Sequence, residues 1–123
     1  MSEKATIQDI KRLKKRIKDN WSLCQLFEGT KRAFEAEMMV AQTVHAATTN
    51  YKKNGEPFSF RGDGVRSCSG GGLTDNATAY GMLISKDYFV EEDRGDKVVI
   101  FITKKLIDYL DVFFAKKDKP IKV

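Results

Sequence analysis

The chain is 123 residues long, which is typical of a single domain, and its formal net charge is +5. Hydrophobic residues make up 41% of it and charged residues 32%, a balance that supplies one modest core and excludes a disordered chain. No apolar run approaches the roughly 18–20 residues of a membrane helix, and the polar N-terminus is not that of a secretion signal. We therefore expect a single cytoplasmic domain over residues 1–123.

The strongest periodic signal in the chain predicts a helix over residues 7–27. Its apolar residues recur at steps of three and four, which places them on one helix face. They are Ile7, Ile10, Leu13, Ile17, Trp21 and Cys24. Thr6 stands at the N-cap position with Asp9 three residues later, the spacing of a capping box, and Gly29 follows the helix. We expect Trp21 to be buried between this helix and the next.

A second helix is predicted from about residue 31 to residue 48. Thr30 is placed to cap it, and its apolar surface is built largely from small residues and methionine. Because the connection is short, we expect residues 1–50 to form an antiparallel helical hairpin. A single bent helix running through Gly29 is the alternative.

Residues 51–102 carry the turn residues and short alternating segments of an antiparallel sheet. The expected strands are residues 58–61, 65–68, 79–84, 88–90 and 97–102, with residues 69–78 as a loop. Thr103 then caps a helix over residues 103–115, and residues 116–123 form a basic tail. The predicted fold is α+β, of order ααββββα with a possible fifth strand, ααββββ(β)α, and with the N-terminal hairpin and the C-terminal helix packed on a small antiparallel sheet.

Positive charge is concentrated in the first predicted helix. Residues 11–18 hold six cations and no acid: Lys11, Arg12, Lys14, Lys15, Arg16 and Lys18. With Leu13 and Ile17 inward, these cations spread over the solvent side, where each can contact a phosphate and release its counterion. An ordinary exposed helix face mixes charges of both signs. The run therefore predicts contact with nucleic acid or another polyanion; a solvated face and a membrane surface are the alternatives.

A glycine-rich segment predicts a second anion site. Consecutive glycines expose backbone N–H groups in the manner of an anion-binding nest. The residues expected there are Arg61, Arg66, Ser69, Gly70, Gly71 and Gly72. Neither the P-loop nor the dinucleotide-binding spacing is present, so a flexible surface loop is the alternative.

The chain offers little for catalysis or for metal binding. Cys24, Cys68 and the single His45 cannot make a tetrahedral zinc site, and reduced thiols are expected, with one disulfide as the alternative. His45 falls among Ala and Met residues of the second helix, so we expect it at the edge of the core. The acidic residues within 91–96 lack the EF-hand spacing and fit a charged hairpin turn. We therefore predict no enzyme activity, no metal and no cofactor.

The C-terminal helix is apolar on nearly all sides. The residues expected to face the sheet are Leu106, Ile107, Leu110 and Phe113. With this spacing, Tyr109, Val112 and Phe114 face in another direction, away from the sheet. Apolar side chains there predict an interface with a second copy or another protein. An unusually well buried helix is the alternative.

Three functions are consistent with these features. The first is a non-enzymatic binding module that contacts nucleic acid or a nucleoprotein through the basic helix. The second is a small regulatory or inhibitory protein that acts through protein–protein contacts. The third is a binder of a small anionic, nucleotide-like ligand at the glycine-rich segment.

Overall fold

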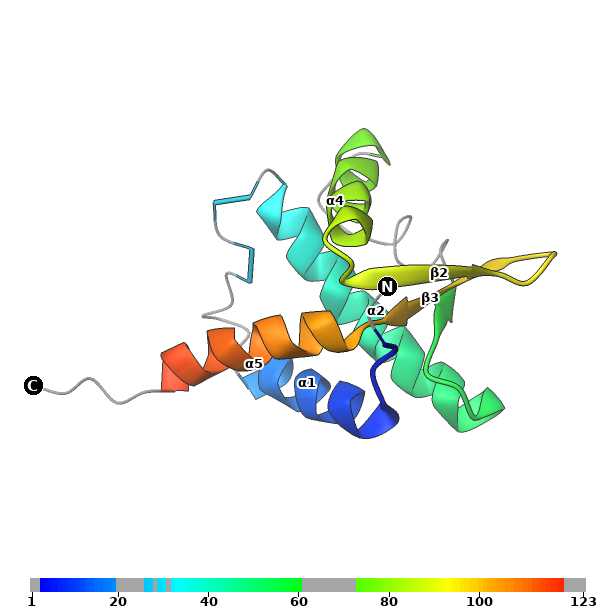
Figure 1. Ribbon diagram of the computed structural model, residues 1–123, viewed down its shortest axis with the longest axis horizontal. Helices are drawn as coiled ribbons and strands as arrows, with labels where there is room; N and C mark the ends of the chain where they lie inside the picture. Colours follow the sequence, from blue (N-terminus) through cyan, green and yellow to red (C-terminus); the bar gives the residue numbers. More distant parts are fainter. Residues whose placement is uncertain (1–2, 20–25, 28, 31, 61–72, 119–123) are drawn as a thin grey trace, which may run out of the picture.

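The computed structural model describes residues 3–19, 26–27, 29–30, 32–60 and 73–118. The described helices are α1 (Ile7–Asp19), α2 (Ala33–Asn54), α4 (Leu73–Ser85) and α5 (Lys104–Asp118). The described strands are β1 (Ser59–Phe60), β2 (Phe89–Asp93) and β3 (Val98–Ile102). The predicted α+β class is confirmed, because helices pack against a small antiparallel sheet (Figure 1).

β3 is the central strand of the sheet, whose order is β1–β3–β2. Ser59 of β1 lies opposite Ile100 of β3, and Phe89 of β2 lies opposite Ile102. The N–H of Ala5 donates to the carbonyl of Ile102 at 2.8 Å. The chain therefore enters α1 beside the point at which it leaves β3 for α5.

The side chains of β3 face two apolar clusters, as the two-residue period of a strand requires. Ile100 and Ile102 join the main core, to which α1, α2, α4 and α5 also contribute. Val99 and Phe101 face a smaller cluster with Phe58, which precedes β1. These four residues of β3 are 3% exposed or less. Burial on both faces of the sheet explains why this strand is a continuous apolar run.

α1 begins as its predicted capping box requires. The N–H of Thr6 donates to Asp9 Oδ2 and the N–H of Asp9 donates to Thr6 Oγ1, both at 3.2 Å. The buried residues of α1 are Ile7, Ile10, Leu13 and Ile17, the predicted inward face. The predicted continuation of this helix to residue 27, with Trp21 and Cys24, falls partly outside the described residues.

α2 begins later and ends later than predicted. The predicted Thr30 cap is wrong: Arg32, with φ 62°, precedes the helix, and no side chain caps it. Because the N–H of Ala36 bonds to the carbonyl of Arg32 at 3.0 Å, Thr30 lies two positions too early. The helix continues to Asn54, and the left-handed φ of 78° at Gly55 ends it. α1 and α2 pack together and run in opposite directions in Figure 1, as the predicted hairpin requires.

The predicted loop over residues 69–78 and strand over residues 79–84 are wrong from residue 73 onward, because residues 73–85 form α4. Ala79 and Leu83 are one helical turn apart and both are buried in the main core. The N–H of Tyr88 donates to the carbonyl of Leu83 at 2.9 Å, and that of Asp87 to Ile84 at 3.0 Å, which is a Schellman motif. Asp87 adopts the left-handed φ of 63° that glycine usually provides, so the sequence lacks the usual sign of a helix end.

The other predicted strands correspond to described ones with shifted ends. The strand predicted over residues 88–90 is β2, which continues to Asp93, and the strand predicted over residues 97–102 is β3. The turn between them includes Gly95 at φ 91°. The strand predicted over residues 65–68 lies outside the described residues.

Thr103 caps α5 as predicted. Its hydroxyl oxygen accepts the N–H of Leu106 at 3.3 Å, and its hydroxyl donates to the carbonyl of Asp87 at 2.6 Å. α5 continues to Asp118, so the first three residues of the predicted tail are helical. One threonine therefore starts the last helix and also ties it to the turn before β2.

Candidate nucleic-acid interface

The six cations of the predicted basic run separate into groups around α1. Because Ile10, Leu13 and Ile17 face the main core, the other positions form a flank on each side and an outer edge. Arg12 and Arg16 lie on the flank next to α5, where each contacts a residue of that helix. The opposite flank, next to α2, carries Lys11, Lys14 and Lys18 at steps of three and four. We call these three residues the lysine flank.

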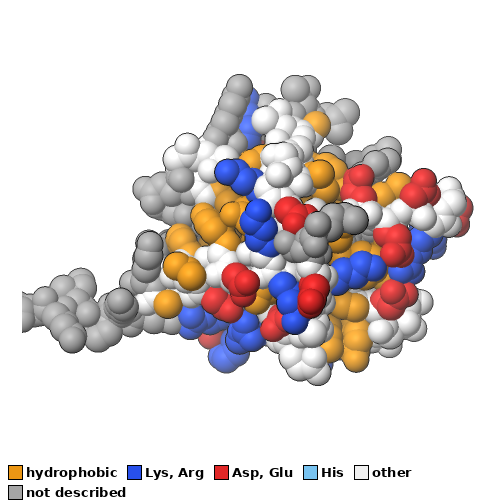
Figure 2. All heavy atoms as spheres, in the orientation of Figure 1, with side chains coloured by type: hydrophobic (Ala, Val, Ile, Leu, Met, Phe, Trp, Pro, Cys, Tyr) orange, Lys and Arg blue, Asp and Glu red, His pale blue; other side chains and the backbone are white. Residues whose placement is uncertain are grey.

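The arginines next to α5 have partners within the protein. Arg12 donates to Asp9 Oδ1 at 3.3 Å and to Asp111 Oδ2 at 2.9 Å. The Arg16 guanidinium lies 5.2 Å from the centre of the Phe114 ring. Figure 2 shows the resulting mixture of basic and acidic side chains over α1 and α5. Residues 11–18 contain no acid, but the fold brings Asp111 of the last helix to Arg12.

The lysine flank has a different environment. Lys11 Nζ lies 6.0 Å from the centre of the Tyr51 ring, at the end of α2. Within the described part of the chain, Lys11, Lys14 and Lys18 form no ion pair. Lys15, on the outer edge, pairs with Asp19 at 2.9 Å. The three lysines of the flank therefore keep their charges available to an external anion.

The last turn of α2, which Lys11 contacts at Tyr51, carries two further cations. Lys52 and Lys53 are both exposed there. The first acid after them, Glu56, receives two hydrogen bonds from Arg94, at 3.1 and 3.0 Å. These bonds hold the pKa of Glu56 below its usual value, so it is anionic at neutral pH and directed to Arg94. The basic last turn followed by Gly55 is the signal by which sequence reasoning could have found this part of the surface.

Lysine ammonium groups in this arrangement can bind successive phosphates. Lys11 and Lys18 are seven residues apart, about 10 Å along a helix. Each ammonium has three donors and no fixed plane, so it binds phosphate oxygens without selecting a base. The surface is therefore suited to a polyanionic backbone.

The predicted partner interface on α5 requires a correction. Phe114 is 1% exposed and belongs to the main core, whereas Phe113, which was expected inward, is half-buried. Both positions follow Leu110 at a helical spacing, and packing selects Phe114. Tyr109 and Val112 are 37% and 57% exposed. The Tyr109 hydroxyl donates to the carbonyl of Leu26 at 2.6 Å, so its polar end is used within the fold.

The outer face of the sheet carries aromatic–cation contacts that sequence reasoning missed. They are Lys4 on Phe101 at 3.9 Å, Arg94 on Phe58 at 5.2 Å and Lys97 on Phe60 at 4.9 Å. Phe58 and Phe101 are buried beneath these side chains. Arg94 is held over them by Glu56 and by Glu92, at 3.0 and 2.6 Å. These cations cover the small cluster of the sheet, and acids pair with Lys4 and Arg94.

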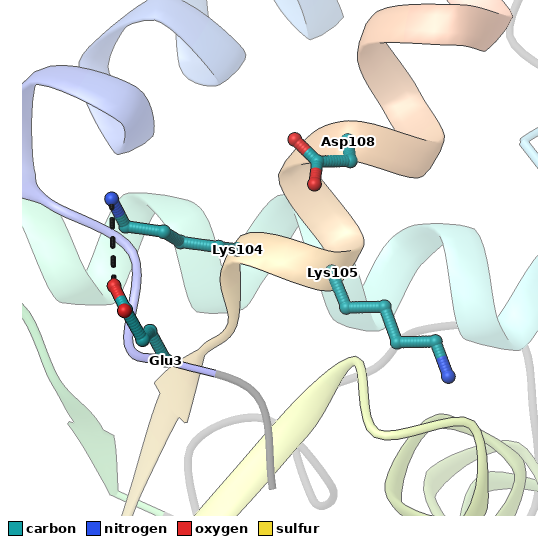
Figure 3. Close-up of a pocket in the computed structure, with 4 residues that line it drawn as sticks. All are labelled: Glu3, Lys104, Lys105 and Asp108. Atoms are coloured by element: carbon teal, nitrogen blue, oxygen red, sulfur yellow. Dashed lines mark ion pairs between the residues drawn. The ribbon is translucent and has the colours of Figure 1, made fainter.

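An open depression of about 540 Å³ lies at the start of α5. Figure 3 shows Lys104 reaching Glu3, at 3.7 Å, while Lys105 points away from that pair and Asp108 lies a turn further along the helix. Two acids and two bases line the depression, so it selects neither an anion nor a cation.

The residues considered for chemistry lie as follows. His45 is exposed on α2, so its expected place at the core edge is wrong; the buried stripe of this helix follows Val40, Val44 and Ala47 instead. The second anion site, Arg61, Arg66, Ser69, Gly70, Gly71 and Gly72, lies outside the described residues, as does Cys68. No group of three or more metal-ligating side chains occurs among the residues that the structure describes.

In the described residues, none of the helices is long and apolar enough to cross a membrane. Comparison with known proteins found no matching family model, no matching curated protein and no matching solved structure.

Proposed function

We propose that this protein is a non-enzymatic, cytoplasmic binding protein that contacts nucleic acid, alone or within a nucleoprotein, through the lysine flank and the end of α2. The observation that carries the proposal is the separation of charges around α1. Carboxylates accompany Arg12 and Lys15, whereas the three lysines of the flank form no ion pair with a described residue. Adjacent Lys52 and Lys53 add two further charges.

The test compares two triple variants of equal charge in binding to a labelled oligonucleotide. Changing Lys11, Lys14 and Lys18 together to glutamine removes the flank. We expect affinity at low salt to fall at least about tenfold, and the slope of log affinity against log salt to become shallower by about 2, because roughly three phosphate contacts are lost. Fluorescence anisotropy at several salt concentrations measures both quantities.

The matched control changes three exposed lysines outside the flank to glutamine: Lys86, Lys104 and Lys105. It lowers the net charge equally but leaves the flank intact, so we expect its affinity to stay within about twofold to threefold and its slope to be unchanged. Equal losses in both variants would show attraction by overall charge alone. Unchanged affinity in the flank variant would contradict the proposal.

A second candidate function is a regulatory or inhibitory contact with another protein or with a second copy of this chain. It is favoured by the exposure of Val112 and of Tyr109 on the same face of α5, and by Phe34, another exposed large apolar side chain. The mass of the protein in solution tests self-association through this face of α5.

A further inference from the structure

We infer that the lysine flank takes single-stranded rather than duplex nucleic acid, with Tyr51 as the residue on which a base stacks. The inference rests on the proposed function and adds to it the class of ligand and one positioning aromatic residue. It depends on where the fold brings Tyr51, which sequence reasoning did not associate with the basic helix.

Tyr51 lies beside the lysine flank although 40 residues separate it from Lys11. Its ring centre is 6.0 Å from Lys11 Nζ, and the side chain is half-buried. Its carbonyl accepts the N–H of Gly55 at 2.9 Å, in the cap that ends α2. The ring is therefore held by a capped helix end, with part of it accessible next to a cation.

The charges around Tyr51 suit a phosphate backbone that passes over it. Lys11 lies on one side, and Lys52 and Lys53 follow in the same helix turn. The acid closest in sequence, Glu56, is directed to Arg94 at 3.0 Å. An aromatic face beside cations is the arrangement by which proteins bind single strands: the cations contact phosphates and the ring stacks on a base.

A duplex does not use such a ring. Its bases are already stacked and show only their edges in the grooves, whereas an unpaired base offers a whole face. The half-buried Tyr51 can meet a base that comes to the surface. A duplex gains from the lysines alone, and a single strand gains from the lysines and the ring.

The other aromatic–cation set, on the outer face of the sheet, does not offer the same arrangement. Phe58 and Phe101 are buried there, and Arg94 over them is bound to two carboxylates. Stacking on Phe58 or Phe101 needs the displacement of those ion pairs, and the half-buried Phe60 has a single cation on it, Lys97 at 4.9 Å, whereas Tyr51 lies beside the lysine flank. Tyr51 needs no such rearrangement.

The experiment measures the affinities of a 15-nucleotide thymidine single strand and of a duplex of equal length for the full chain and two Tyr51 variants. We expect the wild-type protein to bind the single strand more tightly. Tyr51→Leu removes the aromatic face and should weaken single-strand binding about tenfold, while duplex affinity stays within about twofold. Tyr51→Phe keeps the ring and should bind both ligands as the wild type does.

A second measurement needs no variant. A single strand with 2-aminopurine in place of one central base should lose fluorescence when the wild-type protein binds, because stacking on an aromatic ring quenches that base. Equal or tighter duplex binding, equal weakening of both ligands by Tyr51→Leu, or unchanged 2-aminopurine emission overturns the inference. If Lys11, Lys14 and Lys18 still matter in that case, the proposed function stands; if the wild-type protein binds neither ligand, both fail.

Discussion

Leu26 is held on both sides by residues from distant helices. Its N–H donates to Glu37 Oε2 of α2 at 3.2 Å, and its carbonyl accepts the Tyr109 hydroxyl of α5 at 2.6 Å. The Tyr109 ring stacks on Phe27, with a centroid distance of 5.8 Å and an interplanar angle of 3°. The side chains of Glu37 and Tyr109 therefore hold Leu26 in place ahead of α2. Tyr109 thus has a structural role although it is partly exposed.

Glu37 makes this contact dependent on pH. Burial raises the pKa of Glu37 above its ordinary value of 4.5, and the hydrogen bond from Leu26 only partly opposes this effect. The folded protein therefore holds a proton at Glu37 more tightly than the unfolded chain does. The contribution of Glu37 to the free energy of unfolding is therefore fully present below about pH 4.5. It falls as the pH rises through the folded-state pKa of Glu37.

We predict that Glu37→Gln gains stability relative to the wild type as pH rises from 4 to 7. Glutamine still offers an oxygen to the N–H of Leu26 but carries no charge to bury. Urea unfolding at several pH values measures the difference between the two free energies of unfolding. Tyr109→Phe is the control: it removes the other bond to Leu26 and should cost about 1 kcal/mol at every pH in this range. A constant difference for Glu37→Gln contradicts the prediction.

At the scale of elements, α4 shows how a helix can lack its usual sequence signals. Gly81 lies in its interior, and its C-terminal left-handed position holds Asp87 rather than glycine. The pair Ala79 and Leu83 has helical spacing, but the segment is short and apolar enough to suit a strand as well. Packing against α2 and β2 selects the helix.

Two glycine substitutions test the helix over residues 73–85, because we expect them to change the free energy of unfolding in opposite directions. Gly81 has ordinary helical backbone and no atom near an added Cβ, so Gly81→Ala should stabilise the protein by about 0.5–1 kcal/mol. Gly55 ends α2 at φ 78°, so Gly55→Ala should destabilise by about 1 kcal/mol despite equally open space. Denaturant unfolding of both variants measures the effects. Destabilisation by Gly81→Ala is the result that contradicts a helix over residues 73–85.

At the scale of the whole molecule, α5 separates residues that hold the core from residues available to a partner. Phe114 faces the main core with Leu106 and Leu110, while Val112 faces solvent. In Figure 1, α5 lies beside α1, and Arg12 bridges the two helices to Asp111 at 2.9 Å. One side of α5 therefore belongs to the fold, and only the other can contact another protein.

We predict that Phe114→Ala costs about 3–5 kcal/mol of unfolding free energy, as large-to-small changes in a core do. Val112→Asp should change stability by less than about 0.5 kcal/mol, because the side chain is exposed.

If the exposed face of α5 joins two copies, light scattering should give a mass above the 14.0 kDa of one chain for the wild type and that of one chain for Val112→Asp. A mass of one chain for both proteins contradicts self-association through this face.

The sequence by itself determined what depends on neighbours along the chain. The inward stripe of α1, the caps at Thr6 and Thr103, and the strand at Val98–Ile102 follow from spacing and side-chain type within one or two turns. The concentration of cations in residues 11–18 is likewise a property of the chain. These features need only local geometry and the burial of apolar groups.

The tertiary structure decided which of several local solutions is used. The sequence of residues 73–85 is compatible with a helix or with a strand, and packing favours the helix α4. Phe113 and Phe114 are both spaced to face inward from α5, and packing in the main core buries Phe114. It also brought Asp111 to Arg12 and Tyr51 to Lys11, which divides one run of cations into a paired side and a side open to an anion. Contacts between segments 40 or 99 residues apart leave no local pattern in a sequence, because they arise only when distant elements bury their apolar faces together.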